Sequence, residues 1–195
     1  MLEVREAERR DLSQIKRLID EYIAVDFYTM EELENMCSGE DDLLYVVTDG
    51  DRVAAYFYAF LSPLDEALRI LHIQRKPAAL QGCADSERVG VFKTTSTDPA
   101  YRRRGLFSAF MTDLQPVLRE RGAKRIITTA LRPVGREVPI RHILERTGFV
   151  PVMTLYRPWV GNTGYCPYCG LEHCICDAVL YIREYDEKEA ERHGE

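Results

Sequence analysis

Residues 97–110, TDPAYRRRGLFSAF, place three consecutive arginines (102–104) and Gly105 directly before an apolar stretch with helical periodicity. The residues before them, ERVGVFKTTST at 87–97, are rich in β-branched side chains and predict a strand that stops at Asp98-Pro99. The pattern is strand, basic turn and helix. Such a helix start leaves backbone N–H groups unpaired at the positive end of the helix dipole, and a glycine lets an anion approach them. The pattern indicates a phosphate site, although three arginines can equally form a solvated helix entrance.

The helix that follows is predicted to run to Gly122, which is placed to cap its C-terminus. Pro116 lies inside it and is expected to remove one backbone hydrogen bond and bend the second half. Gly105 is not followed by Lys-Ser/Thr, and no G-x-G-x-x-G occurs, which disfavours P-loop and dinucleotide-binding sites. The apolar face of the helix is formed by Leu106, Phe107, Phe110, Met111, Leu114, Val117 and Leu118.

Hydrophobic periodicity divides the rest of the chain into further elements. Asp11 and Gln14 have the spacing of a capping box before a helix, and Thr29 and Glu32 repeat that spacing. Asp49-Gly50 lies between two apolar runs and is a strong hairpin signal. The mixture of helices and hairpins predicts an α+β sheet rather than a doubly wound one. Further strands are expected at 3–8, 124–131, 149–159 and 177–185, and further helices at 139–148, at 186–195 and from Pro63 until Pro77 ends it.

Length and composition describe one globular domain over residues 1–195. The chain has 195 residues, of which 46% are hydrophobic and 30% charged, enough for a core without covalent staples. Its net charge of −6 excludes a surface built as a whole for nucleic acid. The charged N-terminus is not a signal peptide, and no apolar run is long enough to span a membrane. We therefore expect a cytoplasmic protein that does not bind membranes.

Arg102-Arg103-Arg104-Gly105-Leu106-Phe107, placed after a strand and before a helix, resembles the acetyl-CoA signature R/Q-x-x-G-x-G/A of the GNAT-type N-acetyltransferase superfamily. The order of elements over residues 3–185 agrees, and Gly148-Phe149 matches a Gly-Phe typical of the family. Phe107 departs from the signature and must turn into the core to be accommodated. The resemblance implies that acetyl-CoA is bound, with backbone amides around its pyrophosphate and a strand end along its pantetheine. The implied cofactor-binding residues are Thr95, Ser96, Thr97, Arg102, Arg103, Arg104, Gly105, Leu106, Phe107 and Ser108.

The catalytic groups of that family are less clearly matched. Leu144 stands where many members have a tyrosine that protonates the departing thiolate, and Glu137 stands where many have an asparagine. Val91 replaces a glutamate that acts as base in some members. Glu87 lies four residues earlier on the same strand face and is the candidate base, with a surface carboxylate as the alternative. Tyr156 or a water molecule is the candidate acid.

Four of the six cysteines, Cys166, Cys169, Cys174 and Cys176, fall within a loop at 164–178 between the last two predicted strands. The spacing C-x2-C-x4-C-x-C favours a closed structural zinc site, with iron or an iron–sulfur cluster second and two disulfides third. His173 could replace one cysteine, but four thiolates already complete the set. We expect the metal loop to shape acceptor access or contact a partner. Cys37 and Cys83 are expected to be reduced core thiols.

Two functions follow from these patterns. The first is an N-acetyltransferase that moves acetyl from acetyl-CoA to an amine of a small molecule or protein. The second is a catalytically impaired module that binds CoA and uses the zinc loop to contact protein or nucleic acid. Glu172 and Asp177 beside the cysteines, with no Lys or Arg between these, argue against nucleic acid. Residues 63–81 exceed what a hairpin connection needs and suggest either a homodimer contact or an acceptor lid.

Overall fold

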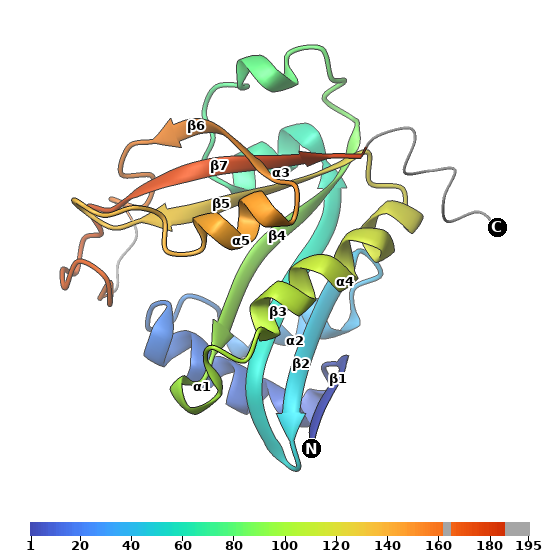
Figure 1. Ribbon diagram of the computed structural model, residues 1–195, viewed down its shortest axis with the longest axis vertical. Helices are drawn as coiled ribbons and strands as arrows, with labels where there is room; N and C mark the ends of the chain where they lie inside the picture. The colour runs from blue at the N-terminus through green and yellow to red at the C-terminus, as the bar shows by residue number, and fades with distance from the viewer. Residues whose placement is uncertain (162–164, 186–195) are drawn as a thin grey trace.

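The computed structural model describes residues 1–161 and 165–185, and within these the strands form one seven-stranded sheet in the order β1-β2-β3-β4-β5-β7-β6 (Figure 1). All neighbouring strands are antiparallel except β4 and β5. This confirms the α+β prediction and the pairing of the last two strands. The strands are β1 Leu2–Glu6, β2 Asp42–Asp49, β3 Arg52–Pro63, β4 Arg88–Thr97, β5 Arg125–Arg132, β6 Val150–Leu155 and β7 Asp177–Glu184.

Helices cover both faces of the sheet (Figure 1). The apolar sides of α1, α2 and α3 pack on one face, and those of α4 and α5 pack on the other, so the sheet separates two hydrophobic clusters. Each helix buries the stripe that its 3.6-residue period predicts. Within the described residues, no helix combines the length and apolar character needed to cross a bilayer. The helices are α1 Leu12–Tyr22, α2 Met30–Ser38, α3 Leu64–Ile70, α4 Leu106–Glu120 and α5 Arg141–Arg146, with 3-10 turns at Arg9–Asp11, Ala78–Leu80 and Pro99–Tyr101.

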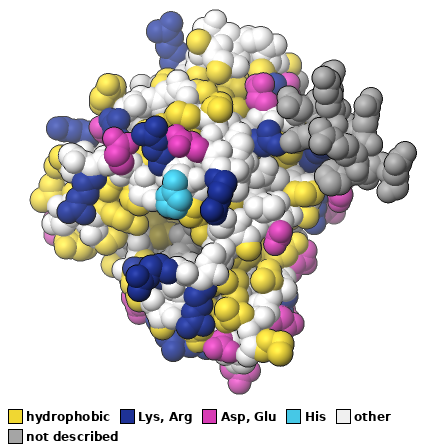
Figure 2. Space-filling model, in the orientation of Figure 1, with side chains coloured by type: hydrophobic (Ala, Val, Ile, Leu, Met, Phe, Trp, Pro, Cys, Tyr) yellow, Lys and Arg dark blue, Asp and Glu magenta, His cyan; other side chains and the backbone are white. Residues whose placement is uncertain are grey.

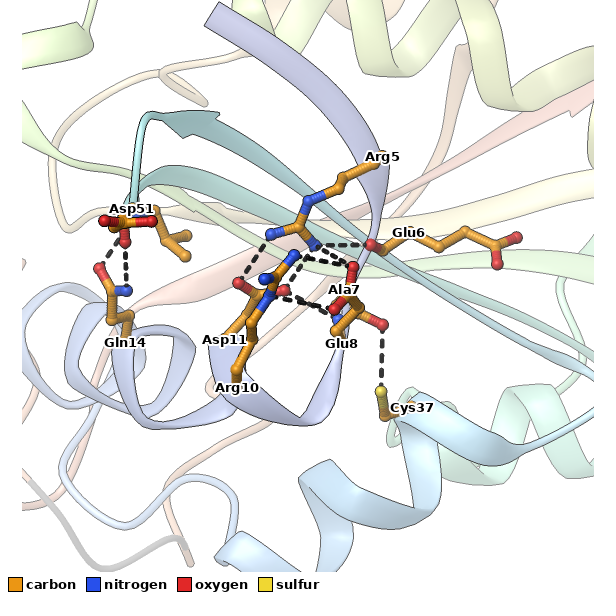
Figure 3. A network of polar contacts seen from close by, with 10 residues as sticks. Arg5, Glu6, Ala7, Glu8, Arg10, Asp11, Gln14, Cys37 and Asp51 are labelled. Carbon is orange, nitrogen blue, oxygen red and sulfur yellow. Dashed lines mark hydrogen bonds and ion pairs between the residues drawn. The ribbon is translucent and has the colours of Figure 1, made fainter.

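The start of α1 differs from the predicted capping box. Asp11 is the last residue of a 3-10 turn, and its carboxylate accepts hydrogen bonds from the Glu8 backbone N–H (2.8 Å) and the Arg5 guanidinium (2.6 and 2.9 Å) (Figure 3). Gln14 instead bridges to the β2–β3 turn, accepting from Val53 N–H at 2.9 Å. Tertiary contacts therefore displaced the local cap. The Thr29–Glu32 capping box of α2 forms as predicted.

The segment after β3 contains a shorter helix than its sequence suggests. α3 ends at Ile70 rather than at Pro77, because His72 adopts a left-handed conformation with φ +57°. The rest of 63–81 is a loop that contains the 3-10 turn Ala78–Leu80. In α4, Pro116 lies within a helix that continues to Glu120, and Gly122 with φ +94° ends it as predicted. The predicted helix at 186–195 lies outside the described residues.

The sheet opens between β4 and β5. These parallel strands pair over three residues only, Gly90–Phe92 against Ile126–Thr128, and then diverge. On its other edge β4 stays paired with β3, but Tyr58 pairs with Thr94 and Ala59 with Phe92, which leaves Lys93 as the extra residue of a β-bulge. A forked opening between two strands is therefore built into the middle of the sheet.

Candidate cofactor and acceptor cleft

A cavity of about 1050 Å³ passes through the fork between β4 and β5. Its walls include residues 93–97 of β4 and 128–131 of β5. Tyr28 and Leu71, from the α1–α3 side of the sheet, line the same cavity as Phe57 and Met111, from the α4 side. The α4 face is hollowed near its middle, with Lys or Arg side chains on either side of the hollow (Figure 2). Residues from both faces of the sheet thus line one continuous cavity.

The start of α4 has the geometry of an anion site. The first helical bond runs from Ala109 N–H to Gly105 O, and within the described residues the N–H groups of Leu106, Phe107 and Ser108 have no acceptor in the protein. Gly105 has φ +78°, and a Cβ at this position would meet no atom within 4 Å. The glycine is therefore required by the backbone turn, and the space beside it is open to a ligand.

The three arginines differ in their surroundings. The Arg102 guanidinium donates to Thr97 O at 3.0 Å and lies 5.0 Å from the centroid of the Tyr22 ring. Arg104 donates to Ala100 O at 3.2 Å and lies over the Tyr101 ring. Arg103 has φ +60° and, within the described residues, its side chain makes no hydrogen bond or ion pair. Two of the guanidinium groups therefore also hold the turn together.

The other predicted cofactor-binding residues lie on β4 and in the first turn of α4. Thr95, Ser96 and Thr97 line the cavity where β5 no longer pairs with β4, and Thr95 Oγ1 donates to Tyr56 O at 2.8 Å. Phe107 turns toward the core beside Phe57, as its size requires, and also lines the cavity. Ser108 Oγ accepts a hydrogen bond from Arg146 at 2.7 Å.

The structure does not bring the two predicted catalytic residues into the cavity. Glu87 precedes β4 at the end away from the fork, and its carboxylate accepts from Arg125 Nε at 2.7 Å. Tyr156 follows β6, is 80% exposed and does not line the cavity. Leu144 does line it and is buried, but it has no proton to give. Glu137 is ion-paired with Arg141.

Lys93 and a group of hydroxyls were missed by sequence reasoning. Lys93 lines the cavity at the bulge, and burial lowers the pKa of its ammonium group to about 8. The hydroxyl groups of Tyr28, Tyr56 and Thr94 are buried in the same region, and the Thr94 hydroxyl lies close enough to both tyrosines to affect their pKa values. Tyr28 and Thr94 also line the cavity. The one signal in the sequence was a lysine among the otherwise uncharged residues 89–97 of the strand.

The four clustered cysteines come together as predicted. Their Sγ atoms all lie within 4.8 Å of one another, close to the spacing of about 3.8 Å that tetrahedral Zn–S bonds of about 2.3 Å give. None forms a disulfide. Gly170, with φ +72°, closes a tight turn in which its N–H bonds Cys166 O at 2.8 Å. Burial raises the pKa of the Cys169 thiol, but hydrogen bonds from the N–H groups of Ile175 and Leu171 outweigh this and lower it to about 7.

This cysteine loop, residues 165–176, forms part of the cavity wall. Cys166, Pro167, Tyr168 and Cys174 line the cavity together with Trp159, which packs against the cysteines. His173 is exposed and stays outside the group of four sulfur atoms. The donor set is complete with cysteine alone, so a soft ion that prefers four thiolates fits it and leaves no open coordination position.

No family model and no curated protein matches the sequence. Solved structures do match. Arabidopsis thaliana NAA60 in complex with acetyl-CoA gives a TM-score of 0.69 at 14% identity, covering 94% of this chain and 98% of that one. The ribosomal-protein-S18-alanine N-acetyltransferase from Escherichia coli gives 0.62 at 17%, covering 96% and 97%. An acetyltransferase of the GNAT family from Streptococcus pneumoniae gives 0.63 at 16%, covering 95% and 100%. The chain therefore has the fold of the GNAT acetyltransferases.

Proposed function

We propose that the protein is an N-acetyltransferase that moves an acetyl group from acetyl-CoA to an amine of a small molecule or protein. The observation that carries this proposal is the cavity through the fork of β4 and β5, which extends from Arg102 and Phe107, at the start of α4, to the opposite face of the sheet. A donor that enters from one face and an acceptor that enters from the other can meet inside it.

In this proposal the start of α4 binds the pyrophosphate of CoA. The N–H groups of Leu106, Phe107 and Ser108 supply donors, and the helix dipole and the arginines at 102–104 supply positive charge. Residues 95–97 supply the free edge of a strand for the pantetheine amides. The donor's thioester then lies toward the fork, where the strands diverge after Phe92 and Thr128.

The acceptor is proposed to enter beside the loop between α1 and α2 and the cysteine loop. Tyr22–Tyr28 and the segment containing Tyr168 line this part of the cavity, so the two loops together set its shape. The cysteine loop is proposed to hold a structural zinc ion on Cys166, Cys169, Cys174 and Cys176. Zinc there supplies no chemistry to the reaction; it fixes the wall against which the acceptor binds.

Coenzyme A binding tests this function with two matched glycine variants. Gly105→Ala and Gly50→Ala both put a Cβ on a backbone of positive φ with open space around it, so both are expected to lose about 1 kcal/mol of stability. Only Gly105 adjoins the proposed pyrophosphate site. In calorimetry with acetyl-CoA we expect Gly105→Ala to weaken binding at least tenfold and Gly50→Ala to leave it unchanged. Absence of any heat with the unaltered protein overturns the proposal.

Metal content tests the zinc site. The unaltered protein is expected to contain about one zinc ion per chain by elemental analysis, since four thiolates complete one tetrahedral ion. Replacing Cys166 and Cys169 by serine should abolish it and lower the melting temperature, whereas replacing Cys37 and Cys83, which lie outside the cluster, should not change the metal content. Full metal content in the Cys166 and Cys169 double variant would refute the assignment.

A CoA-binding module without catalytic activity is the second candidate. It is favoured by one observation, namely that Glu87 and Tyr156 lie outside the cavity and Leu144 cannot transfer a proton. Measuring CoA release from acetyl-CoA with a panel of amines separates the two functions. Binding of CoA without turnover of any amine supports the module, and turnover supports the transferase.

A further inference from the structure

Lys93 occupies a distinctive place in the fold, at the point where β4 leaves β5. It directly follows Phe92, the last residue of β4 that pairs with β5, and it is the residue that the bulge leaves without a partner on β3. Bulges redirect side chains, and they occur often beside active sites. Here the bulge brings a lysine side chain into the cavity at the fork.

The ammonium group of Lys93 has few protein partners to replace the water that it loses on burial. Its Nζ donates to Ile70 O, at the end of α3, at 3.2 Å, and within the described residues no carboxylate lies within ion-pair distance. Lys93 is half-buried, and a cation held there by one carbonyl loses hydration that it does not fully recover, so its neutral form is favoured. Of the residues of β4 and β5 that line the cavity, 92–97 and 128–131, Lys93 alone has an ionisable side chain.

The groups around Lys93 do not stabilise its charged form. After α3 lies His72, whose pKa is lowered by burial and by the charge of Lys93. From the loop between α1 and α2 comes Tyr28, whose hydroxyl is buried, and Asp26 of the same loop is ion-paired with Lys16. On β3, Tyr58 donates to Asp42 at 2.6 Å. None of these interactions supplies Lys93 with a carboxylate partner.

We propose that Lys93 is the base that removes the proton from the acceptor's ammonium group. The inference rests on the proposed acetyl transfer and supplies the proton acceptor that Glu87 cannot supply from outside the cavity. The neutral Lys93 amine takes one proton, and the acceptor becomes a free amine. Its lone pair forms the C–N bond to the thioester carbonyl, the C–S bond breaks, and the thiolate of CoA takes a proton from the new amide nitrogen. Lys93 returns its proton to solvent.

The same position also suits a different role, in which a permanent positive charge binds a carboxylate on the acceptor. The two roles make opposite demands on a substitution by arginine. A guanidinium group keeps its charge and binds carboxylates well, but it cannot take up a proton. Lys93→Arg therefore separates a base from an anion-binding residue, and Lys93→Met removes both functions.

The test measures CoA release against pH for the best amine of the panel, with Lys124→Met as the control for loss of an exposed lysine. We expect kcat/KM of the unaltered protein to rise up to about pH 8, and kcat of both Lys93→Met and Lys93→Arg at pH 8 to fall about 100-fold or more. Binding of acetyl-CoA by calorimetry should change by less than about threefold. Activity retained by Lys93→Arg, or by Lys93→Met, overturns the inference while leaving the transferase intact.

A second measurement tests the role of Lys93 even if no amine of the panel is turned over or a variant fails to fold. The unaltered protein is labelled briefly with acetic anhydride from pH 6 to 11, and modification of Lys93 is followed by mass spectrometry with and without CoA. We expect a midpoint near pH 8 and protection by CoA. A midpoint near that of Lys124, or equal labelling with CoA bound, overturns the inference. A lack of CoA binding by calorimetry instead overturns the proposed function itself.

Discussion

Lys93 holds a charge in the half-buried wall of the cavity, and the free-energy cost of this placement depends on pH. Its pKa is about 8 in the folded protein against 10.5 for a free side chain, so below pH 8 both states are protonated and folding bears the full cost of burial. That cost is at most about 3 kcal/mol from the difference between the two pKa values. As pH rises from 8 to 10.5 the folded state loses its proton first, and the cost disappears.

Lys93→Met should therefore be more stable than the unaltered protein at pH 7, with a difference that shrinks toward pH 10.5. Melting temperatures measured at intervals across this range give the comparison. Lys124→Met, which removes an exposed lysine, should show no such trend. A constant difference at all pH values would mean that the pKa of Lys93 is the same in the folded and unfolded states, against the inference drawn from its burial.

Some residues of the candidate site could be predicted from the sequence, and others became visible only in the structure. The arginines with Gly105 and the four cysteines could be proposed from the sequence because each group is contiguous or closely spaced along the chain. Lys93 was missed because its position depends on a one-residue mismatch between β3 and β4, which no local pattern encodes. Glu87 shares a predicted strand face with Val91, but periodicity does not tell which end of a strand faces a cavity.

Among the elements, α4 and β4 approach each other closely at Gly90. A Cβ on Gly90 would lie 2.9 Å from Leu118 Cδ1 and 3.4 Å from Ile126 Cγ1. Leu118 is completely buried, so it has little space into which it can move. The absence of a side chain at Gly90 therefore allows α4 to lie close to the sheet where β4 pairs with β5.

Gly90→Ala is expected to lower the free energy of unfolding by about 1–3 kcal/mol through overpacking. Gly82→Ala is the matched control, because a Cβ there meets no atom within 4 Å and φ is not positive. It should be neutral or slightly stabilising. Denaturant unfolding of the two variants measures the difference, and equal stabilities would show that α4 adjusts without cost.

Element prediction succeeded where local and tertiary forces agree. The β2–β3 hairpin, the Thr29–Glu32 cap and the end of α4 at Gly122 all follow from short-range rules and form as predicted. The α1 cap failed because Arg5 on β1 engages Asp11, a contact that depends on how the strand and helix pack. α3 is shorter than its periodicity suggests, because the chain turns at His72 instead of continuing to Pro77.

For the whole molecule, Trp159 links the cysteine loop to the cavity and can report on both. It is the single tryptophan of the chain, it packs against the cysteines, and it lines the cavity. Removing metal with a chelator is expected to loosen this packing and shift its fluorescence emission to longer wavelength. Zinc should restore the emission, and Cys37→Ser with Cys83→Ser should behave like the unaltered protein. Unchanged emission on metal removal would show that the cysteine loop holds its shape without an ion.

The limited contact between β4 and β5 has a consequence for how the molecule unfolds. Strands β1–β4 and strands β5–β7 are each joined by long antiparallel ladders, whereas three residue pairs connect the two groups within the sheet. The seam between them is thus the place where cooperativity is weakest. A nucleotide thioester that spans this seam would cross-brace the two halves, so occupancy by the donor should merge any separate melting transitions into one at a higher temperature.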